Sequence, residues 1–223
     1  MNPGPRFAER GSQRWLQVCV RRRPELLERA LAGSLRESIR WQSPQPPAFK
    51  EYRDAAALRL AGIAAPLRRP LQSSWPRRGP VWDAIGITSS NAPVFLEAKA
   101  NLPEAASPGS KARGASLKMI RRAVAEAQRF YCGSTTRDWT GTYFQYANRL
   151  AHHYFLRQLN RVPSHLVFVY FLNAVDVAGP ETVAQWRAAI ARIHDALGLP
   201  GDLRKHDVHE AFVDVAGLVN VAR

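Results

Sequence analysis

The amino-acid sequence predicts an α/β protein, with a mixed β-sheet covered by helices, and three stretches carry this prediction. Residues 81–101 hold two runs of strand-forming residues around a turn-rich centre, the pattern of a β-hairpin. Residues 113–131 place apolar side chains on one face at helical spacing. Residues 165–173, H-L-V-F-V-Y-F-L-N, form a nearly continuous apolar run, typical of a strand buried on both faces. Strands that alternate with helices of this length indicate an α/β sheet.

The first 45 residues predict a helical extension packed on the main domain, which we place at residues 46–223. Residues 12–32 carry an apolar stripe, and Pro24 divides them into two helices because proline fits only the first turn of a helix. Residues 33–47 contain three prolines and predict a linker or surface loop.

The chain between this extension and the hairpin predicts one helix and one short strand. Residues 49–61 predict the helix, with Glu51 and Asp54 near its start, where they share a face. Residues 67–72 predict the strand, within a segment that is otherwise a basic, proline-rich loop.

After the hairpin the predicted elements are a loop, two helices, a strand, a helix and a strand. In chain order they are residues 102–111, 113–131, 142–159, 165–173, 181–197 and 208–215. Pro180 precedes the last helix and Gly198 follows it, in positions where these residues commonly begin and end helices.

The net charge of +14 in 223 residues is the strongest signal in the composition. Such a surplus favours a polyanionic partner, either nucleic acid or a membrane surface, although an arginine- and alanine-rich chain can also reflect biased genome composition. The sequence has no apolar run of membrane-spanning length and no apolar signal segment at its start, so we expect a cytoplasmic protein without a membrane partner. Its two cysteines, Cys19 and Cys132, match no metal or redox spacing.

The second strand of the hairpin brings an acid and a lysine to one face. Glu97 and Lys99 point the same way because strand side chains alternate, while their neighbours enter the core. A turn centred near Ser90 places Asp83 opposite Glu97, whereas a one-residue slip would separate the two acids. Neighbouring carboxylates repel unless a cation lies between them, and hard divalent cations prefer oxygen ligands. The hairpin therefore predicts a metal site, and its structural alternative is a cross-strand ion pair in an edge hairpin.

Asp83, followed fourteen positions later by Glu97-Ala98-Lys99, resembles the bipartite signature of the restriction-endonuclease-like PD-(D/E)xK nucleases. Trp82, rather than proline, precedes the aspartate. The resemblance implies a restriction-endonuclease-like core of α-β-β-β-α-β order and a phosphodiesterase that depends on Mg²⁺ (or Mn²⁺). It also implies that Asp83, Glu97 and the backbone carbonyl of Ala98 hold the metal. Lys99 would then serve the attacking water.

Two further residues resemble elements of related nucleases. Glu51 resembles the metal-directed glutamate on the helix before the sheet, and the alternative is an exposed glutamate favoured by the helix dipole. Gln128, in Gln128-Arg-Phe-Tyr131, resembles the Q-x-x-x-Y element of recombination-type exonucleases, with a spacing one residue short.

The helix predicted after the hairpin carries a basic stripe. Its members share one face at helical spacing: Lys118, Arg121, Arg122 and Arg129. We expect Glu126 to project elsewhere, so that no acid interrupts the stripe. Because this helix follows the strand with Glu97, the stripe predicts contacts with nucleic-acid phosphates, and a solvated helix face is the alternative.

Neither histidine pair in the sequence predicts a metal site. His152 and His153 are adjacent on a predicted helix and therefore point apart, as surface or packing residues do. His206 and His209 are three residues apart near the last strand and face opposite sides.

These observations together predict a magnesium-dependent deoxyribonuclease. DNA is the expected partner, while RNA as substrate and a homodimer as assembly stay open. The alternative function is a non-catalytic nucleic-acid-binding module that retains the nuclease fold, and a third is a structural or partner-binding protein. No phosphate-loop, nucleophile-elbow or H-E-x-x-H motif supports a different chemistry.

Overall fold

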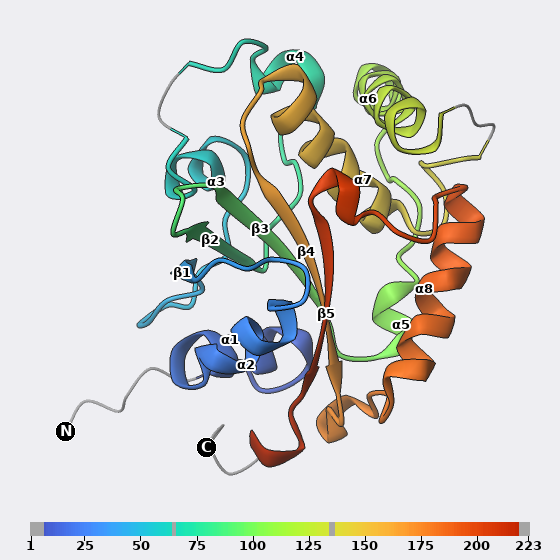
Figure 1. Ribbon diagram of the computed structural model, residues 1–223. Coiled ribbons are helices and arrows are strands. Elements are labelled where there is room, and N and C mark those ends of the chain that lie inside the picture. The colour runs from blue at the N-terminus through green and yellow to red at the C-terminus, as the bar shows by residue number, and fades with distance from the viewer. Residues whose placement is uncertain (1–6, 64–65, 134–136, 219–223) are drawn as a thin grey trace.

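The computed structural model describes residues 7–63, 66–133 and 137–218. A five-stranded mixed β-sheet runs through the centre of the molecule (Figure 1). Its strands lie side by side in chain order: β1 (Ile39–Ser43), β2 (Ala84–Thr88), β3 (Pro93–Lys99), β4 (His165–Leu172) and β5 (Val208–Asp214). The predicted α/β class with a mixed sheet is confirmed.

The sheet changes from antiparallel to parallel pairing at β3. β1 pairs antiparallel with β2, and β2 with β3, whereas β3, β4 and β5 run parallel to one another. Antiparallel neighbours can be joined by a tight turn, but parallel neighbours need a longer crossover, and both crossovers here contain helices. The carboxyl end of β3 therefore lies between an antiparallel neighbour and a parallel one.

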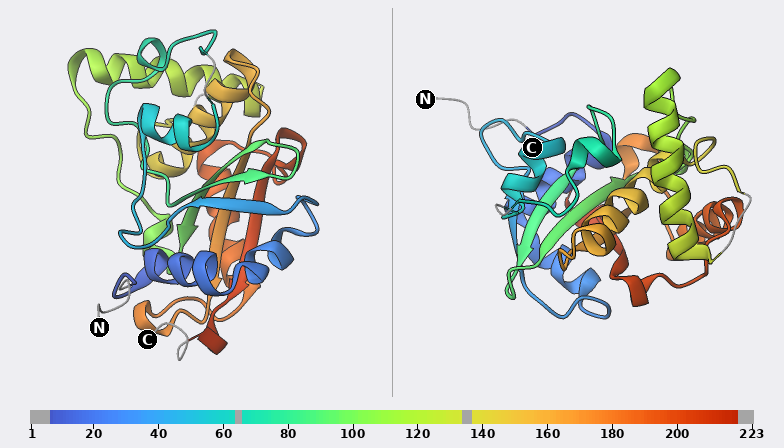
Figure 2. Two further views of the ribbon diagram at one scale, coloured as in Figure 1. Left: turned by 90° about the vertical axis from the view of Figure 1, so that its left-hand side faces the viewer. Right: turned by 90° about the horizontal axis from the view of Figure 1, so that it is seen from above.

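Helices cover both faces of the sheet (Figures 1 and 2). The α-helices are α1 (Gly11–Arg22), α2 (Pro24–Leu31), α3 (Asp54–Leu60), α4 (Leu71–Ser74), α5 (Leu102–Ala105), α6 (Gly114–Cys132), α7 (Phe144–Tyr154) and α8 (Val183–Leu197). A π-helical turn (Phe155–Leu159) continues α7, and 3₁₀ turns lie at Val175–Val177, Arg204–His206 and Ala216–Leu218. Within the described ranges no helix has the length and apolarity to cross a membrane.

The alternation of side chains along β4 gives the sheet two cores. Phe168 and Tyr170 enter the core beneath α7 and α8, where the ring of Tyr146 stacks on Phe168 at 4.1 Å between centroids. Val167 enters the opposite core with Leu27 of α2. Because every second residue serves each core, the prediction that this strand is buried on both faces is confirmed.

The predicted breaks at Pro24 and Gly198 are also confirmed. Pro24 is the first residue of α2, where its missing N–H has no intrahelical partner to lose. Gly198 ends α8 with a left-handed φ of 70°, a conformation that glycine adopts without a Cβ clash. The helices and strands predicted after residue 112 all lie within a few residues of their observed bounds.

Residues 33–47 are not the predicted linker, because they contain the edge strand β1. Ile39 and Trp41 are buried and alternate with Arg40, which is exposed. On the neighbouring strand, a Cβ at Gly86 would lie 2.5 Å from Ile39 Cγ2, so glycine permits this close packing. Residues 7–43 thus contain two helices that pack on the sheet and one strand that belongs to it. A division of the chain near residue 45 stays a prediction.

Two predictions between β1 and β2 are wrong. Residues 67–72 form no strand; instead α4 begins at Leu71, directly after Pro70. The backbone of this segment pairs with no strand of the sheet, and α4 packs against α6. The predicted helix at 49–61 begins only at Asp54, because Tyr52 pairs in extended conformation with Trp82.

Candidate functional site

The register of the β2–β3 hairpin places Asp83 opposite Glu97. Ala84 pairs with Leu96, and one further step along the antiparallel register joins residues 83 and 97. The backbone N–H of Asp83 donates to the Leu96 carbonyl at 3.1 Å, which holds this step in place. The register predicted from a turn centred near Ser90 is therefore confirmed.

The Asp83 carboxylate takes the place of a neighbouring strand along β3, where the pairing with β2 has ended. The backbone N–H of Ala98 donates to Asp83 Oδ2 at 2.7 Å. In a β-strand the N–H and the carbonyl of one residue point to the same side, so the Ala98 carbonyl lies on the edge that faces Asp83. Asp83 and the Ala98 carbonyl thus share one edge of β3, as the metal-ligand prediction requires.

Glu97 is a buried carboxylate held between two cations. Its Oε1 lies 2.6 Å from Lys99 Nζ, and its Oε2 accepts a hydrogen bond of 2.7 Å from Arg149 Nε. The Glu97 side chain is 2% exposed, and burial acts to raise its pKa. Arg149 and Lys99 outweigh burial and hold the pKa of Glu97 below its usual value. Glu97 is therefore ionised at neutral pH.

The sequence prediction missed Arg149, which α7 carries into the site. Its guanidinium also donates to the Val81 carbonyl at 2.8 Å and lies over the ring of Trp82 at 5.0 Å. With 3% of its side chain exposed, it is a core residue rather than part of the basic surface. The only feature of the sequence that indicated a buried Arg149 was its position next to Leu150, on the buried side of an amphipathic helix.

Lys99 has a second partner that fixes its amine. Nζ donates to Gln145 Oε1 at 2.5 Å, so β3 and α7 hold the ammonium together. The side chain of Lys99 keeps 14% exposure. The predicted pairing of Glu97 and Lys99 on one face is confirmed. The strand lies inside the sheet, not at an edge, and the ion pair runs along one strand, so the cross-strand edge pair offered as the alternative is wrong.

Two other acids lie within electrostatic range of Glu97. Burial, followed by the charge of Glu97, raises the pKa of Asp83 well above its usual value. The same two causes raise the pKa of Glu51, whose Oε1 accepts a hydrogen bond of 3.1 Å from Gln13. A carboxylate with a raised pKa is held ionised only at a cost, which a bound cation would lower.

Glu51 lies near Glu97 because of an extended segment, not because of a helix. It lies three residues before α3 begins, so the prediction that it starts a helix is wrong. Asp54 does not share its face, because the Asp54 carboxylate accepts the backbone N–H groups of Arg78 and Gly79. The pairing of Tyr52 with Trp82 explains the placement, since it brings Glu51 beside the first strand of the hairpin.

By donor type the site fits a hard divalent cation such as Mg²⁺ or Mn²⁺. Asp83, Glu97 and the Ala98 carbonyl offer oxygen ligands, and the cation would share Glu97 with Arg149 and Lys99. Among the described residues, the one group of three His, Cys, Asp or Glu side chains whose ligand atoms converge within 4.8 Å lies elsewhere. A cation between Asp83 and Glu97 would therefore take water for its remaining ligands, as Mg²⁺ commonly does.

The basic stripe on α6 is exposed as predicted, but an acid joins it. Lys118, Arg121, Arg122 and Arg129 all lie at the surface. The expectation for Glu126 is wrong, because it pairs with Arg122 at 3.1 Å and with Arg69 at 3.2 Å. An acid four residues after an arginine lies one turn further along the same side of the helix, within reach of its guanidinium.

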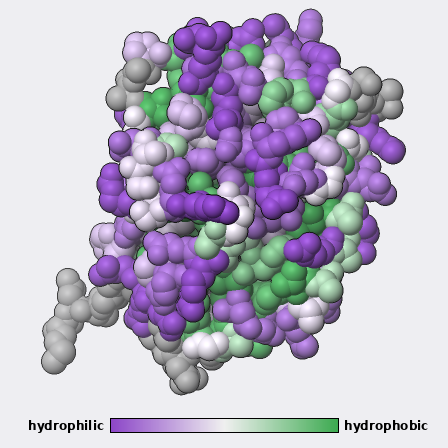
Figure 3. Space-filling view, in the orientation of Figure 1, coloured by the Kyte–Doolittle hydropathy of each residue, from purple (hydrophilic) through white to green (hydrophobic). Residues whose placement is uncertain are grey.

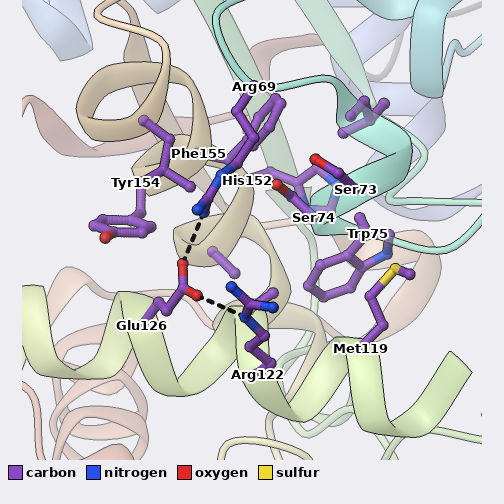
Figure 4. A pocket seen from close by; sticks show the side chains of 14 residues that line it. Arg69, Ser73, Ser74, Trp75, Met119, Arg122, Glu126, His152, Tyr154 and Phe155 are labelled. Atoms are coloured by element: carbon purple, nitrogen blue, oxygen red, sulfur yellow. Dashed lines mark hydrogen bonds and ion pairs between the residues drawn. The ribbon is translucent and has the colours of Figure 1, made fainter. Parts of the chain in front are cut away.

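Glu126 closes the rim of a small hollow between α4, α6 and α7 (Figure 4). Arg69 and Arg122 converge on its carboxylate from opposite sides, and Trp75 and Phe155 form part of the wall. The interior that a water-sized sphere can enter measures about 20 Å³, which is room for about one water molecule. We assign no ligand to this hollow.

The remaining sequence candidates have packing roles. Gln128 is buried, and its Nε2 donates to the Arg137 carbonyl at 2.8 Å. His152 and His153 are also buried, which fits the packing role expected of them. His153 bonds Tyr131 through Nδ1 at 2.8 Å and the Ser164 carbonyl through Nε2 at 3.0 Å.

Comparison with known proteins gives this chain no relative. No protein-family model, no curated protein and no solved structure matches it. The assignment of a function therefore depends on the chemistry of the residues described above.

The Glu97–Arg149 pair predicts a large effect of a single substitution. Arg149→Met keeps much of the apolar stem but leaves Glu97 buried beside Lys99 alone, so we expect a loss of about 3–5 kcal/mol in the free energy of unfolding. Chemical denaturation measures this loss, and Arg192→Met, at an exposed arginine of α8, is the matched control.

Adding Glu97→Gln to Arg149→Met removes both charges and should recover part of the lost stability, because no unpaired buried carboxylate remains. A loss below about 1 kcal/mol for Arg149→Met, the size expected of exposed ion pairs, would contradict this description of Glu97.

Proposed function

We propose that the chain is a Mg²⁺- or Mn²⁺-dependent nuclease that hydrolyses phosphodiester bonds, with DNA as its substrate class. The observation that carries the proposal is the pairing of Asp83 with Glu97 across the hairpin, with the Lys99 amine 2.6 Å from Glu97 on the same strand. Two acids and an amine at one end of a strand resemble the catalytic set of the PD-(D/E)xK nucleases.

The order of elements supports the same proposal. Helix α2 is followed by three antiparallel strands, β1 to β3, then by the short helix α5 and by α6 and α7, and then by β4 parallel to β3. This order is similar to the α-β-β-β-α-β core of restriction-endonuclease-like nucleases. It counts α2 and β1 as parts of the core, so the core in this proposal begins before residue 46, where the division predicted from the sequence had placed it. In that comparison α3 and α4 are insertions between the first two strands, and α8 and β5 extend the core.

The side chains of the site have separate roles in this proposal. Asp83, Glu97 and the Ala98 carbonyl would hold the cation, with Glu51 assisting. A bound Mg²⁺ lowers the pKa of a water ligand and offsets negative charge on the phosphate. Lys99, whose amine is held by Gln145, would orient that water or stabilise the anionic transition state.

Arg149 has a positioning role. It holds Glu97 Oε2 through Nε and the Val81 carbonyl through a second nitrogen, so it ties the acid to the entry of the hairpin. A guanidinium with several donors in a fixed plane suits this task better than a lysine amine.

The charge of the molecule supports nucleic acid as the partner. The net charge is +14, and α6 presents exposed cations from Lys118 to Arg129. Cations on a helix surface bind phosphates without regard to base sequence. Arg122 contributes less than its neighbours in this respect, since Glu126 already pairs with it.

A non-catalytic nucleic-acid-binding module is the second candidate, and one observation favours it. Both oxygens of Glu97 are already engaged, one by Lys99 and one by Arg149, so the charge of this acid is balanced without a metal. Under this alternative the basic surface would bind nucleic acid and the buried ion pairs would only stabilise the hairpin.

Cleavage of DNA separates the two candidates. We expect the purified protein to cut DNA in the presence of Mg²⁺ or Mn²⁺ and to stop when EDTA is added. Lys99→Met should remove cleavage while leaving DNA binding in place. A panel of linear, nicked, branched and single-stranded DNA that stays uncut with both metals, at several protein concentrations, would contradict the catalytic proposal.

The basic stripe predicts the salt dependence of binding. Each lost phosphate contact removes about 0.9 from the slope of log affinity against log salt, so Arg121→Gln with Arg129→Gln should flatten the slope by about 1.8. Fluorescence anisotropy across a salt series measures the slope, with Arg192→Gln on α8 as the matched control. An unchanged slope in the double variant would mean that the stripe is only a solvated surface.

A further inference from the structure

Two histidines meet where the parallel strands β4 and β5 begin. His165 is the first residue of β4, and His209 is the second residue of β5. Leu166 pairs with Val208, and Val167 pairs with His209, so the two imidazoles lie two register positions apart on the same face of neighbouring strands. Asp207, directly before β5, has a left-handed φ of 57° that ends the preceding 3₁₀ turn.

The ligand atoms of these three residues converge. His165 Nδ1 lies 3.1 Å from His209 Nε2 and 3.6 Å from Asp207 Oδ1. One ligand atom from each residue lies within 4.8 Å of the others. Two ligands bound at about 2.1 Å from a tetrahedral metal are separated by about 3.4 Å. These two separations lie on either side of that value, and the third pair of ligand atoms lies within 4.8 Å, so the three atoms are close enough to share one metal ion.

The type of donor selects the class of metal. Two imidazole nitrogens and one carboxylate oxygen suit Zn²⁺ and related transition metals, whereas Mg²⁺ and Ca²⁺ prefer oxygen ligands alone.

A neighbouring arginine orients the carboxylate. Arg157 bonds Asp207 Oδ2 at 2.5 Å and the Ser164 carbonyl at 2.8 Å, while Oδ1 of the same carboxylate faces His165. Partners of this kind commonly fix the ligands of metal sites. The side chains of His165 and Asp207 keep 12% and 33% exposure, so an ion and a water molecule can reach the group from solvent.

His209 is the most buried of the three residues. It is 3% exposed, and its Nε2, which lies 3.1 Å from His165 Nδ1, is the atom that it offers to a metal. Two imidazole nitrogens at this distance can share one proton, and a cation between them would replace that hydrogen bond by two metal–nitrogen bonds. Its Nδ1 lies on the other side of the ring, has no hydrogen-bond partner within the described part of the chain, and is not counted as a ligand.

This group is separate from the acidic site. Val94 of β3 pairs with His165, whereas Glu97 pairs with Phe168 three residues further along β4. By the alternation of the strand, His165 shares a face with Val167, and Glu97 lies on the opposite face with Phe168. The two groups therefore lie at different ends and on different faces of the parallel strands.

We propose that His165, Asp207 and His209 form a binding site for one divalent transition metal of the Zn²⁺ class, with water completing the ligands. The metal would join the beginnings of β4 and β5. His206 takes no part, because its ring packs 4.8 Å from Phe130. The proposal does not depend on the nuclease function, since it uses none of the residues of the acidic site.

Calorimetric titration of the full chain, stripped with chelator, with ZnCl₂ tests the site. We expect one Zn²⁺ per chain, bound also in excess Mg²⁺, and a higher melting temperature with Zn²⁺. Asp207→Asn, which keeps a residue that tolerates the left-handed backbone, and His165→Gln should each weaken binding at least tenfold. His206→Gln is the matched control and should leave Zn²⁺ binding unchanged.

The melting curve without metal shows whether each variant is folded. Failure of the unmodified chain to bind Zn²⁺, or its loss of Zn²⁺ to excess Mg²⁺, would overturn the proposal whatever the variants do. Equal Zn²⁺ affinity in folded Asp207→Asn, folded His165→Gln and the unmodified chain would overturn it as well.

Discussion

The ion pairs of the buried Glu97 carboxylate are the interaction on which the rest of the structure depends. A charge that is 2% exposed requires partners, and Glu97 has Lys99 on its own strand and Arg149 on α7. Arg149 reaches on to the Val81 carbonyl, so one guanidinium joins β3, α7 and the entry to β2. The position of α7 over the sheet is therefore coupled to the charge of a single acid.

The same ion pairs bear on whether the site is catalytic or only part of a nucleic-acid-binding module. Two cations already balance Glu97, but they do nothing comparable for Asp83, whose pKa is raised by burial and by Glu97 itself. A site made only for stability would gain from an uncharged residue at position 83. The acceptor for the Ala98 N–H is a structural role that an uncharged asparagine could also fill. The negative charge of Asp83, on the β3 edge that also carries the Ala98 carbonyl, is what the proposed cation site explains.

The hairpin could be predicted because its information is local. Alternation along the strand and a turn centred near Ser90 were sufficient to place Asp83 opposite Glu97. The strand β1 was missed because a five-residue run beside three prolines does not have a clear strand pattern. Its place in the sheet depends on close packing against Gly86, which is distant in the sequence. The burial of Arg149 and the meeting of His165 with His209 depend on elements that are distant in sequence, so no local pattern contains them.

Thermal melting of Asp83→Asn with and without Mg²⁺ tests most directly whether the acids are arranged for a cation. Asn is nearly isosteric and can still accept the Ala98 N–H, so only the charge is lost. We expect equal or higher stability of the variant without metal, and stabilisation by Mg²⁺ in the unmodified chain but not in the variant. Asp195→Asn, an exposed acid on α8, should behave as the unmodified chain. A destabilised variant with an unchanged response to Mg²⁺ would contradict the account.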